Sequence, residues 1–181
     1  IKNLVIDMPI SIIPQYAGLA VFCTTEEVQQ VPPTNIYGTC APGDTLAGTA
    51  SIDTPLLPNG SLTGEVYLED SGGTLPYLHI RIHNAALGVE VRLRALVETI
   101  GSPAHLRVTV NSREDSSAAN IPDIPLNSLT ISLPGTANYG PITKVGNSCR
   151  KTDSSVSNVS SWAGTTSSIT QNFTFDPACP N

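Results

Sequence analysis

The residues with the clearest chemical character form a short row, His79, Arg81 and His83, in segment 77–83 (YLHIRIH). Alternate residues of a β-strand point to the same face of its sheet, so these three side chains are expected side by side. Two histidines on one face are typical of a metal site, but the arginine between them disfavours a cation and leaves an anion site or a recognition surface. The alternative, which we favour, is a solvated strip of polar side chains without a ligand.

Trp162, in the segment SSWAG, is the single tryptophan of the chain. An indole ring can stack on a sugar, so Trp162 is a second candidate binding residue; the alternative is a local plug of a small core. The sequence has no G-x-S-x-G, H-E-x-x-H or phosphate-binding glycine loop, and no D-x-D-x-D-G calcium loop. A glycosidase pair of carboxylates could come from distant strands, but nothing points to one. We expect neither catalysis nor a metal or cofactor.

Four cysteines are present, Cys23, Cys40, Cys149 and Cys179, and an even number admits three pairings that sequence alone does not select. Their positions make Cys23–Cys40 and Cys149–Cys179 the simplest pairing, each contributing about 3 kcal/mol. A site with zinc on four thiolates favours closely spaced pairs, which are absent. A nucleophilic cysteine needs an activating histidine, and no motif supplies one. Structural disulfides are predicted, which persist outside the reducing cytosol.

Three N-x-S/T triplets begin at Asn59, Asn158 and Asn172. In a secreted eukaryotic protein they would be glycosylation sites on exposed backbone. Chance is the alternative, and we prefer it in a chain this rich in Asn, Ser and Thr.

The composition limits the class of protein. A chain of 181 residues fits one domain, 1–181, with 13% charged and 40% hydrophobic residues. Nine Lys and Arg against fifteen Asp and Glu give a net charge of −6, which repels a nucleic-acid backbone. No apolar run approaches the roughly 20 residues that span a bilayer. Since the chain opens at Ile1 without a signal core, we interpret it as a mature chain, a processed product or an excised segment.

Strands are predicted along most of the chain. Segment 87–100 (LGVEVRLRALVETI) alternates apolar and charged residues, as a strand with one buried and one wet face does. Many short strands separated by Pro, Gly, Asn and Ser predict an antiparallel β-sandwich of Ig-like or Greek-key type, with polar faces in water. EDSGG at 69–73 predicts a hairpin turn. The other expected strands are 3–8, 18–23, 45–52, 62–69, 77–83, 105–110, 128–133 and 168–175.

One short helix is expected. In CTTEEVQQV, Thr24 precedes Glu27 by three residues, the spacing of a capping box, and about two turns would cover the first disulfide loop. Pro122 and Pro125 precede strand 128–133 and Pro134 follows it, so this strand is expected at a sheet edge.

The order of several blocks carries a resemblance. LVIDMPISIIPQYAGLAVFC is followed by CAPGDTLAGTASIDTPL, then LTGEVYL, LPYLHIRI, IPDIPLNSLTISLPG and a final cysteine loop with SWAG. This order resembles the repeated β-sandwich domains of large secreted or cell-surface proteins of high-GC Gram-positive bacteria, which carry similar C…C-P…G, PLL…LTG-x-VYL, LP-x-L and P-D-x-P blocks. Ala41 departs from the proline usual beside the cysteine, and the spacer QQVPPTNIYG is unusual. The resemblance implies an extracellular structural or adhesive module, found in series, with no catalytic residues to carry over.

The expected function is that of a non-catalytic extracellular assembly module, a subunit or repeat of a surface stalk, sheath or filament. Its expected partners are copies of itself or neighbouring repeats, joined through the apolar N-terminal strand 1–8 by β-augmentation. The alternative is an adhesin that binds a carbohydrate or a host surface through the His79, Arg81 and His83 row or through Trp162.

Overall fold

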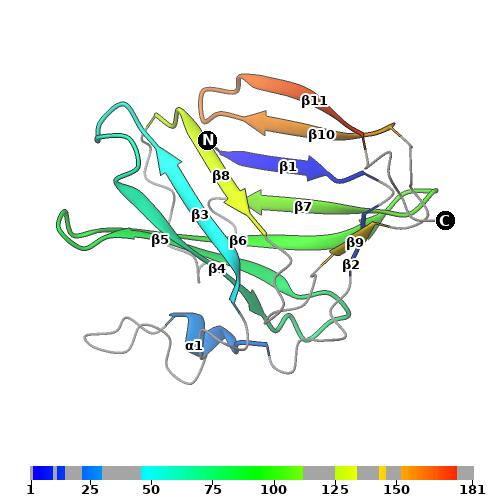
Figure 1. The fold of residues 1–181 in the computed structure, drawn as a ribbon, viewed down its shortest axis with the longest axis horizontal. Coiled ribbons are helices and arrows are strands. Elements are labelled where there is room, and N and C mark those ends of the chain that lie inside the picture. The colour runs from blue at the N-terminus through cyan, green and yellow to red at the C-terminus, as the bar shows by residue number, and fades with distance from the viewer. Residues whose placement is uncertain are drawn as a thin grey trace.

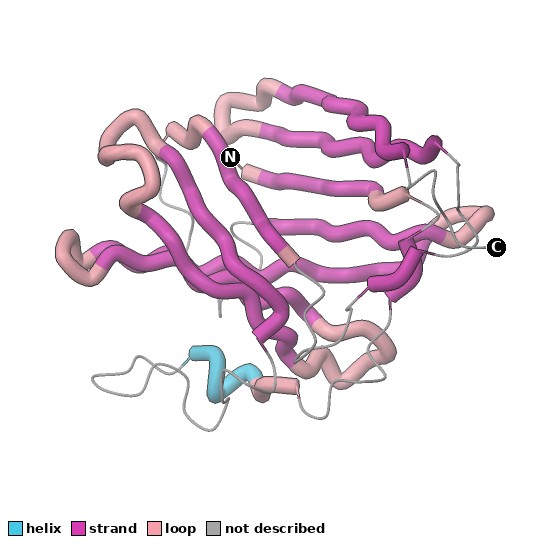
Figure 2. The backbone as a smooth tube through the Cα atoms, viewed as in Figure 1, coloured by secondary structure: helices cyan, strands magenta, loops and turns pink. Residues whose placement is uncertain are grey.

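The computed structural model describes residues 2–9, 12–14, 22–29, 46–111, 125–133, 143–145 and 152–174. Strands make up most of this part, and helix α1 lies outside the sheet (Figure 2). The predicted all-β antiparallel architecture is therefore confirmed. The elements are β1 (Asn3–Asp7), β2 (Ile12–Pro14), α1 (Thr25–Gln29), β3 (Leu46–Asp53), β4 (Leu62–Glu69), β5 (Tyr77–Asn84), β6 (Val89–Ile100), β7 (His105–Asn111), β8 (Ser128–Ser132), β9 (Thr143–Val145), β10 (Thr152–Ser160) and β11 (Thr166–Thr174).

Nine of the strands form one curled antiparallel sheet in the order β11-β10-β1-β7-β6-β5-β4-β3-β8, and β2 pairs with β9 in a separate ribbon. In Figure 1, β1, β7, β10 and β11 run side by side across the picture, whereas β3 and β8 run diagonally to them. These nine strands thus make one continuous sheet in which the direction of the strands changes from one end to the other.

Strand β1 lies inside this sheet. It pairs with β10 on one side and with β7 on the other, both antiparallel. The Arg107 guanidinium of β7 donates two hydrogen bonds, of 2.6 and 2.9 Å, to the Asp7 carboxylate. Since both edges of β1 are occupied within the chain, pairing of strand 1–8 with a neighbouring subunit would require one of these pairings to open.

The core lies on one face of the sheet. Leu78, Ile80 and Ile82 of β5 are buried there, as their alternation predicts. Leu4 of β1 and Ile131 of β8 pack against the same cluster, so the core extends from β1 to the β8 edge of the sheet. The cluster also contains Ala47, Ala50, Ile52, Leu62, Val66, Leu68, Val91, Leu93, Ala95, Val97, Leu106 and Val110.

Several elements predicted from local patterns form in the structure. The capping-box helix forms as α1, strand 128–133 forms as edge strand β8, and segment 69–73 opens the β4–β5 turn, where Gly72 has a φ of 67°. Strand β10 was missed because TDSSVSNVS has little apolar alternation, and the short strands β2 and β9 were missed as well. Most of predicted strand 18–23 lies outside the described residues.

Gly64 marks a close approach between β4 and β5. A Cβ added there would lie 1.7 Å from the backbone oxygen of Arg81, a contact that requires the two strands to separate. We expect Gly64→Ala to lower the free energy of unfolding by about 2 kcal/mol or more, measured by urea denaturation. Gly73→Ala is the matched control, because the nearest atom to its Cβ is a side-chain atom, the Ser71 hydroxyl at 3.2 Å, and not the backbone. Equal stability of both variants would contradict this close approach.

Candidate functional site

The segment that carries α1 is fastened across the end of β4. The Cys23 backbone N–H donates to the Leu68 carbonyl (3.0 Å), and the Asp70 N–H donates to the Cys23 carbonyl (2.8 Å). The predicted capping box is formed: the Glu27 N–H donates to the Thr24 hydroxyl (3.2 Å), and the Thr24 N–H donates to the Glu27 carboxylate (2.8 Å). The helix is therefore held in place at its N-terminus, over the face of the sheet opposite the main core.

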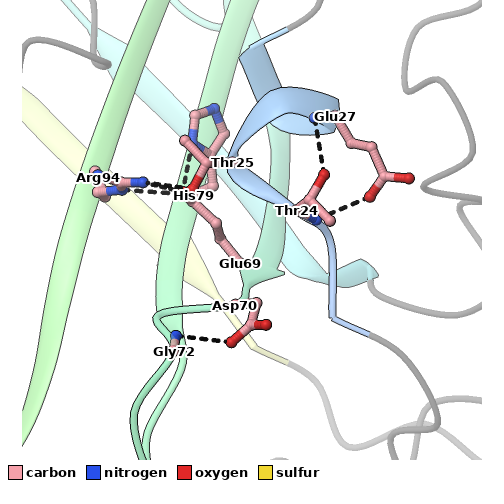
Figure 3. Close-up of polar contacts among 8 residues, drawn as sticks. All are labelled: Thr24, Thr25, Glu27, Glu69, Asp70, Gly72, His79 and Arg94. Atoms are coloured by element: carbon pink, nitrogen blue, oxygen red, sulfur yellow. Dashed lines mark hydrogen bonds and ion pairs between the residues drawn. The ribbon is translucent and has the colours of Figure 1, made fainter.

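Beneath this segment lies a buried charged group that we call the Glu69 cluster: Glu69, Arg94, His79 and Thr25 (Figure 3). The Glu69 side chain is 0% exposed. The Arg94 guanidinium donates to both of its carboxylate oxygens, the Nε bond being 3.0 Å, and the Thr25 hydroxyl donates to Oε1 (2.7 Å). His79 Nδ1 lies 3.4 Å from Oε2. Residues from β4, β5, β6 and α1 thus meet on one carboxylate.

The environment keeps this carboxylate ionised. Burial alone would raise the pKa of Glu69, but the neighbouring His79 ring and the hydrogen bonds from Arg94 and Thr25 outweigh it and lower the pKa from 4.5 to about 2. The Arg94 guanidinium also lies over the Tyr77 ring, 4.5 Å from its centroid. The cluster is therefore a charge-assisted network that links α1 to three strands.

A second ion-pair group lies on the same face. Glu90 accepts from the Arg81 guanidinium (3.0 Å) and from Arg92. Arg81 and Arg92 are only 6% and 8% exposed. Burial alone would raise the pKa of Glu90, but hydrogen bonds from both guanidiniums hold it below the ordinary value. The charges of β5 and β6 are thus engaged with each other across the strands.

These contacts correct the sequence interpretation of the His79, Arg81 and His83 row. The three residues do share one face, but His79 is 2% exposed and Arg81 6%, so the favoured solvated strip is wrong for both. The His83 side chain is 34% exposed, and its Nδ1 lies 4.0 Å from the Glu65 carboxylate. Alternation predicts the shared face correctly but says nothing of α1, which comes from a distant part of the sequence and lies over Glu69 and His79.

Trp162 lies elsewhere in the sheet. It occupies the turn between β10 and β11, where the Lys2 ammonium is 5.8 Å from its ring centroid. Three strands, β1, β7 and β6, separate this hairpin from β5. The structure therefore does not bring Trp162 to the row.

The remaining predicted residues are partly described. Cys23 is 1% exposed, and the three other cysteines, Cys40, Cys149 and Cys179, lie outside the described residues. Asn59 is exposed in the β3–β4 turn, and Asn158 and Asn172 are exposed on β10 and β11. Glycosylation at these sites stays a prediction. Within the described ranges, no group of three or more His, Cys, Asp or Glu could hold a metal ion.

The sequence did not reveal a groove of about 410 Å³ at the β8 end of the sheet. Alternate Ser and Thr residues in β3, β4 and β8 were a visible signal, but the pairing of β8 with β3 that brings them together was not. The groove can offer hydroxyl and carboxylate groups to a polar ligand. Its lining consists of Thr49, Ala50, Ser51, Thr63, Gly64, Glu65, Thr130 and Ser132.

Fold and site together define the class: an all-β protein built on one curled antiparallel sheet with an ion-paired polar face. No protein-family model, curated protein or solved structure matches the chain. None of the helices in the described part has the length and apolar character needed to cross a membrane.

The pKa of Glu69 makes stability depend on pH. Because the folded-state pKa lies below the ordinary 4.5, ionised Glu69 contributes stability that is fully present above about pH 4.5 and is lost as the pH falls toward 2. We expect Glu69→Gln to cost about 3 kcal/mol at neutral pH, because Arg94 loses its buried counter-charge, and to flatten the decline in acid. Denaturant unfolding between pH 2 and 7 measures both effects. Glu26→Gln, on the exposed side of α1, is the control, and a cost no larger than that of the control would contradict the role of the cluster.

Thr25 links α1 to the cluster, because its hydroxyl donates to Glu69 and accepts from Arg94 Nη2 (3.2 Å). We expect Thr25→Val to cost about 1 kcal/mol and to speed amide hydrogen exchange in residues 22–29 selectively. Exchange that accelerates evenly over the whole sheet would contradict this local role.

Proposed function

We propose that this chain is a non-catalytic extracellular structural module, a subunit or repeat of a surface stalk, sheath or filament. One observation carries the proposal: the buried carboxylates and arginines of the central strands are paired with one another. Glu69 is held by Arg94, and Glu90 by Arg81 and Arg92. Such networks hold elements in place, whereas a catalytic group needs access to a substrate.

The extracellular setting rests on the cysteines and on the resemblance to repeated domains of high-GC Gram-positive surface proteins. We propose disulfides Cys23–Cys40 and Cys149–Cys179. Burial of Cys23 and the absence of a free cysteine in the described part of the chain support the first. Disulfides of this kind persist in secreted and cell-surface proteins.

We further propose that the curled sheet acts as a β-sandwich of Ig-like or Greek-key type, with its two ends as the two layers. The support is the shared core, in which Leu4 of β1 and Ile131 of β8 pack against one apolar cluster. A module of this kind suits assembly in series.

The second candidate function is an adhesin that binds carbohydrate. The hydroxyl-lined groove between β8, β3 and β4 favours it, because hydroxyl and carboxylate groups suit the hydrogen-bonding pattern of sugars. Glu65 lies in this groove, whereas the buried His79 and Arg81 offer little surface to a ligand.

Electron microscopy of the native protein with light scattering tests the leading proposal. We expect ordered assemblies of repeating subunits. A dispersed 19.0 kDa monomer at all concentrations, together with glycan-array binding that Glu65→Ala removes, would favour the adhesin instead. Trp162→Ala serves as the comparison variant in the array, since Trp162 lies on a hairpin far along the sheet order.

A further inference from the structure

The two ends of the nine-stranded sheet differ in how they are protected. Among the described strands, β8 ends the sheet on one side and β11 on the other. Strand β8 has five residues, and the sequence places Pro125 and Pro134 around it. Short length and proline are devices that keep an edge from pairing with another chain. Strand β8 is therefore a protected edge.

Strand β11 has none of these devices. Its nine residues, TSSITQNFT, contain no proline and no charged residue, and residues 163–172 are all exposed. Ile169 is 60% exposed, and among the large exposed hydrophobic residues of the described chain it alone lies on an edge strand. A long, uncharged edge with an exposed apolar residue is a template for a further strand.

No described strand pairs with the outer edge of β11, so its backbone presents hydrogen-bonding groups there to a further strand. The Ser161 N–H donates to the Thr165 carbonyl across the β10–β11 turn (2.8 Å). In an antiparallel pair, successive residues point their N–H and C=O groups alternately toward the partner strand and away from it. With Thr165 facing β10, the backbone N–H and C=O groups of Ser167 and Ile169 also point toward β10. Those of Ser168 and Thr170 point toward the open edge.

We propose that β11 pairs antiparallel with β11 of a second copy of this chain, about a two-fold axis at Ile169. This inference deepens the proposed function, on which it rests, by naming the partner and the joint. The register places Ile169 opposite its counterpart in a non-hydrogen-bonded pair, with Ser168 opposite Thr170.

A second copy of the chain can approach along an uncharged edge. Each copy carries a net charge of −6, so two copies repel over most of their surfaces. Both described edge strands are uncharged, but β8 is the protected one, and pairing along β11 adds no like-charge pair and covers Ile169 on both copies. The pairing also continues the antiparallel order of the sheet, giving eighteen strands from two nine-stranded sheets.

Sedimentation of the full chain tests the joint. We expect the wild type to sediment at twice 19.0 kDa, or as larger assemblies built from such dimers. Ile169→Lys places two ammonium groups opposite each other, and Thr170→Pro removes an N–H that faces the open edge; each should weaken dimerisation at least about tenfold. Thr130→Lys, an exposed position on β8, is the matched control and should dimerise like the wild type. Urea unfolding of each variant checks that it is folded.

Cysteine crosslinking tests the register. Ile169→Cys should give a disulfide-linked dimer that reductant separates, because the two Cα atoms of a non-hydrogen-bonded pair lie about 4.5 Å apart. Ser168→Cys should not, since it faces Thr170 of the other copy. A monomeric wild type, or dimers unaffected by Ile169→Lys, would overturn the inference.

Different results would contradict the structural role and the β11 joint. Dimers that depend on Ile169 but build no ordered polymer would support the β11 joint and contradict the structural role. Ordered polymers that persist in the folded Ile169→Lys variant would support the structural role and overturn the β11 joint.

Discussion

The buried pair of Glu69 and Arg94 is the interaction on which the arrangement of the polar face depends. A carboxylate that is 0% exposed is tolerated in a protein interior only when charge and hydrogen bonds compensate for lost water. Arg94 and Thr25 supply hydrogen bonds to it, and His79 lies within ion-pair distance. Because these groups come from β4, β5, β6 and α1, the compensation exists only when all four elements are in place. The pair therefore couples the short helix to the centre of the sheet.

The two faces of the sheet are stabilised in different ways. Apolar side chains fill one face from β1 to the β8 edge and join these strands in one core. On the other face, cross-strand ion pairs and the α1 segment cover the centre, and exposed polar residues occupy the outer strands. In a sheet with one solvated face, the polar residues of that face are ordinarily exposed. Here they are buried at the centre of the sheet, where the charged residues are concentrated. As a result, open backbone groups and exposed hydroxyl residues are found at the ends of the sheet, at β11 and in the groove beside β8.

Much of the fold could be predicted from the sequence because short local patterns of residue types indicate its strands and its helix. Period-2 alternation located β5 and β6, the Thr24–Glu27 spacing located α1, and the prolines around β8 indicated an edge. Strand β10 was not predicted, because its Ser-rich sequence has no apolar face and its strand conformation is supported by pairing with β1 and β11. Pairing between distant segments is a tertiary property that local patterns do not encode.

The candidate site was predicted less well for the same reason. The shared face of His79 and Arg81 followed from alternation, but their burial depends on α1 and on carboxylates of β4 and β6 that only the fold brings near. Charged residues on a strand therefore do not by themselves indicate a wet surface.

The central claim is that the central strands are covered and paired within the chain, and that a second copy pairs along the outer edge of β11. Residue-resolved amide hydrogen exchange at low and high protein concentration tests it most directly. The account predicts that Ser168 and Thr170 gain protection as the concentration rises, while Arg94 and His79 stay protected throughout. Exchange at Ser168 and Thr170 that is the same at every concentration would contradict it.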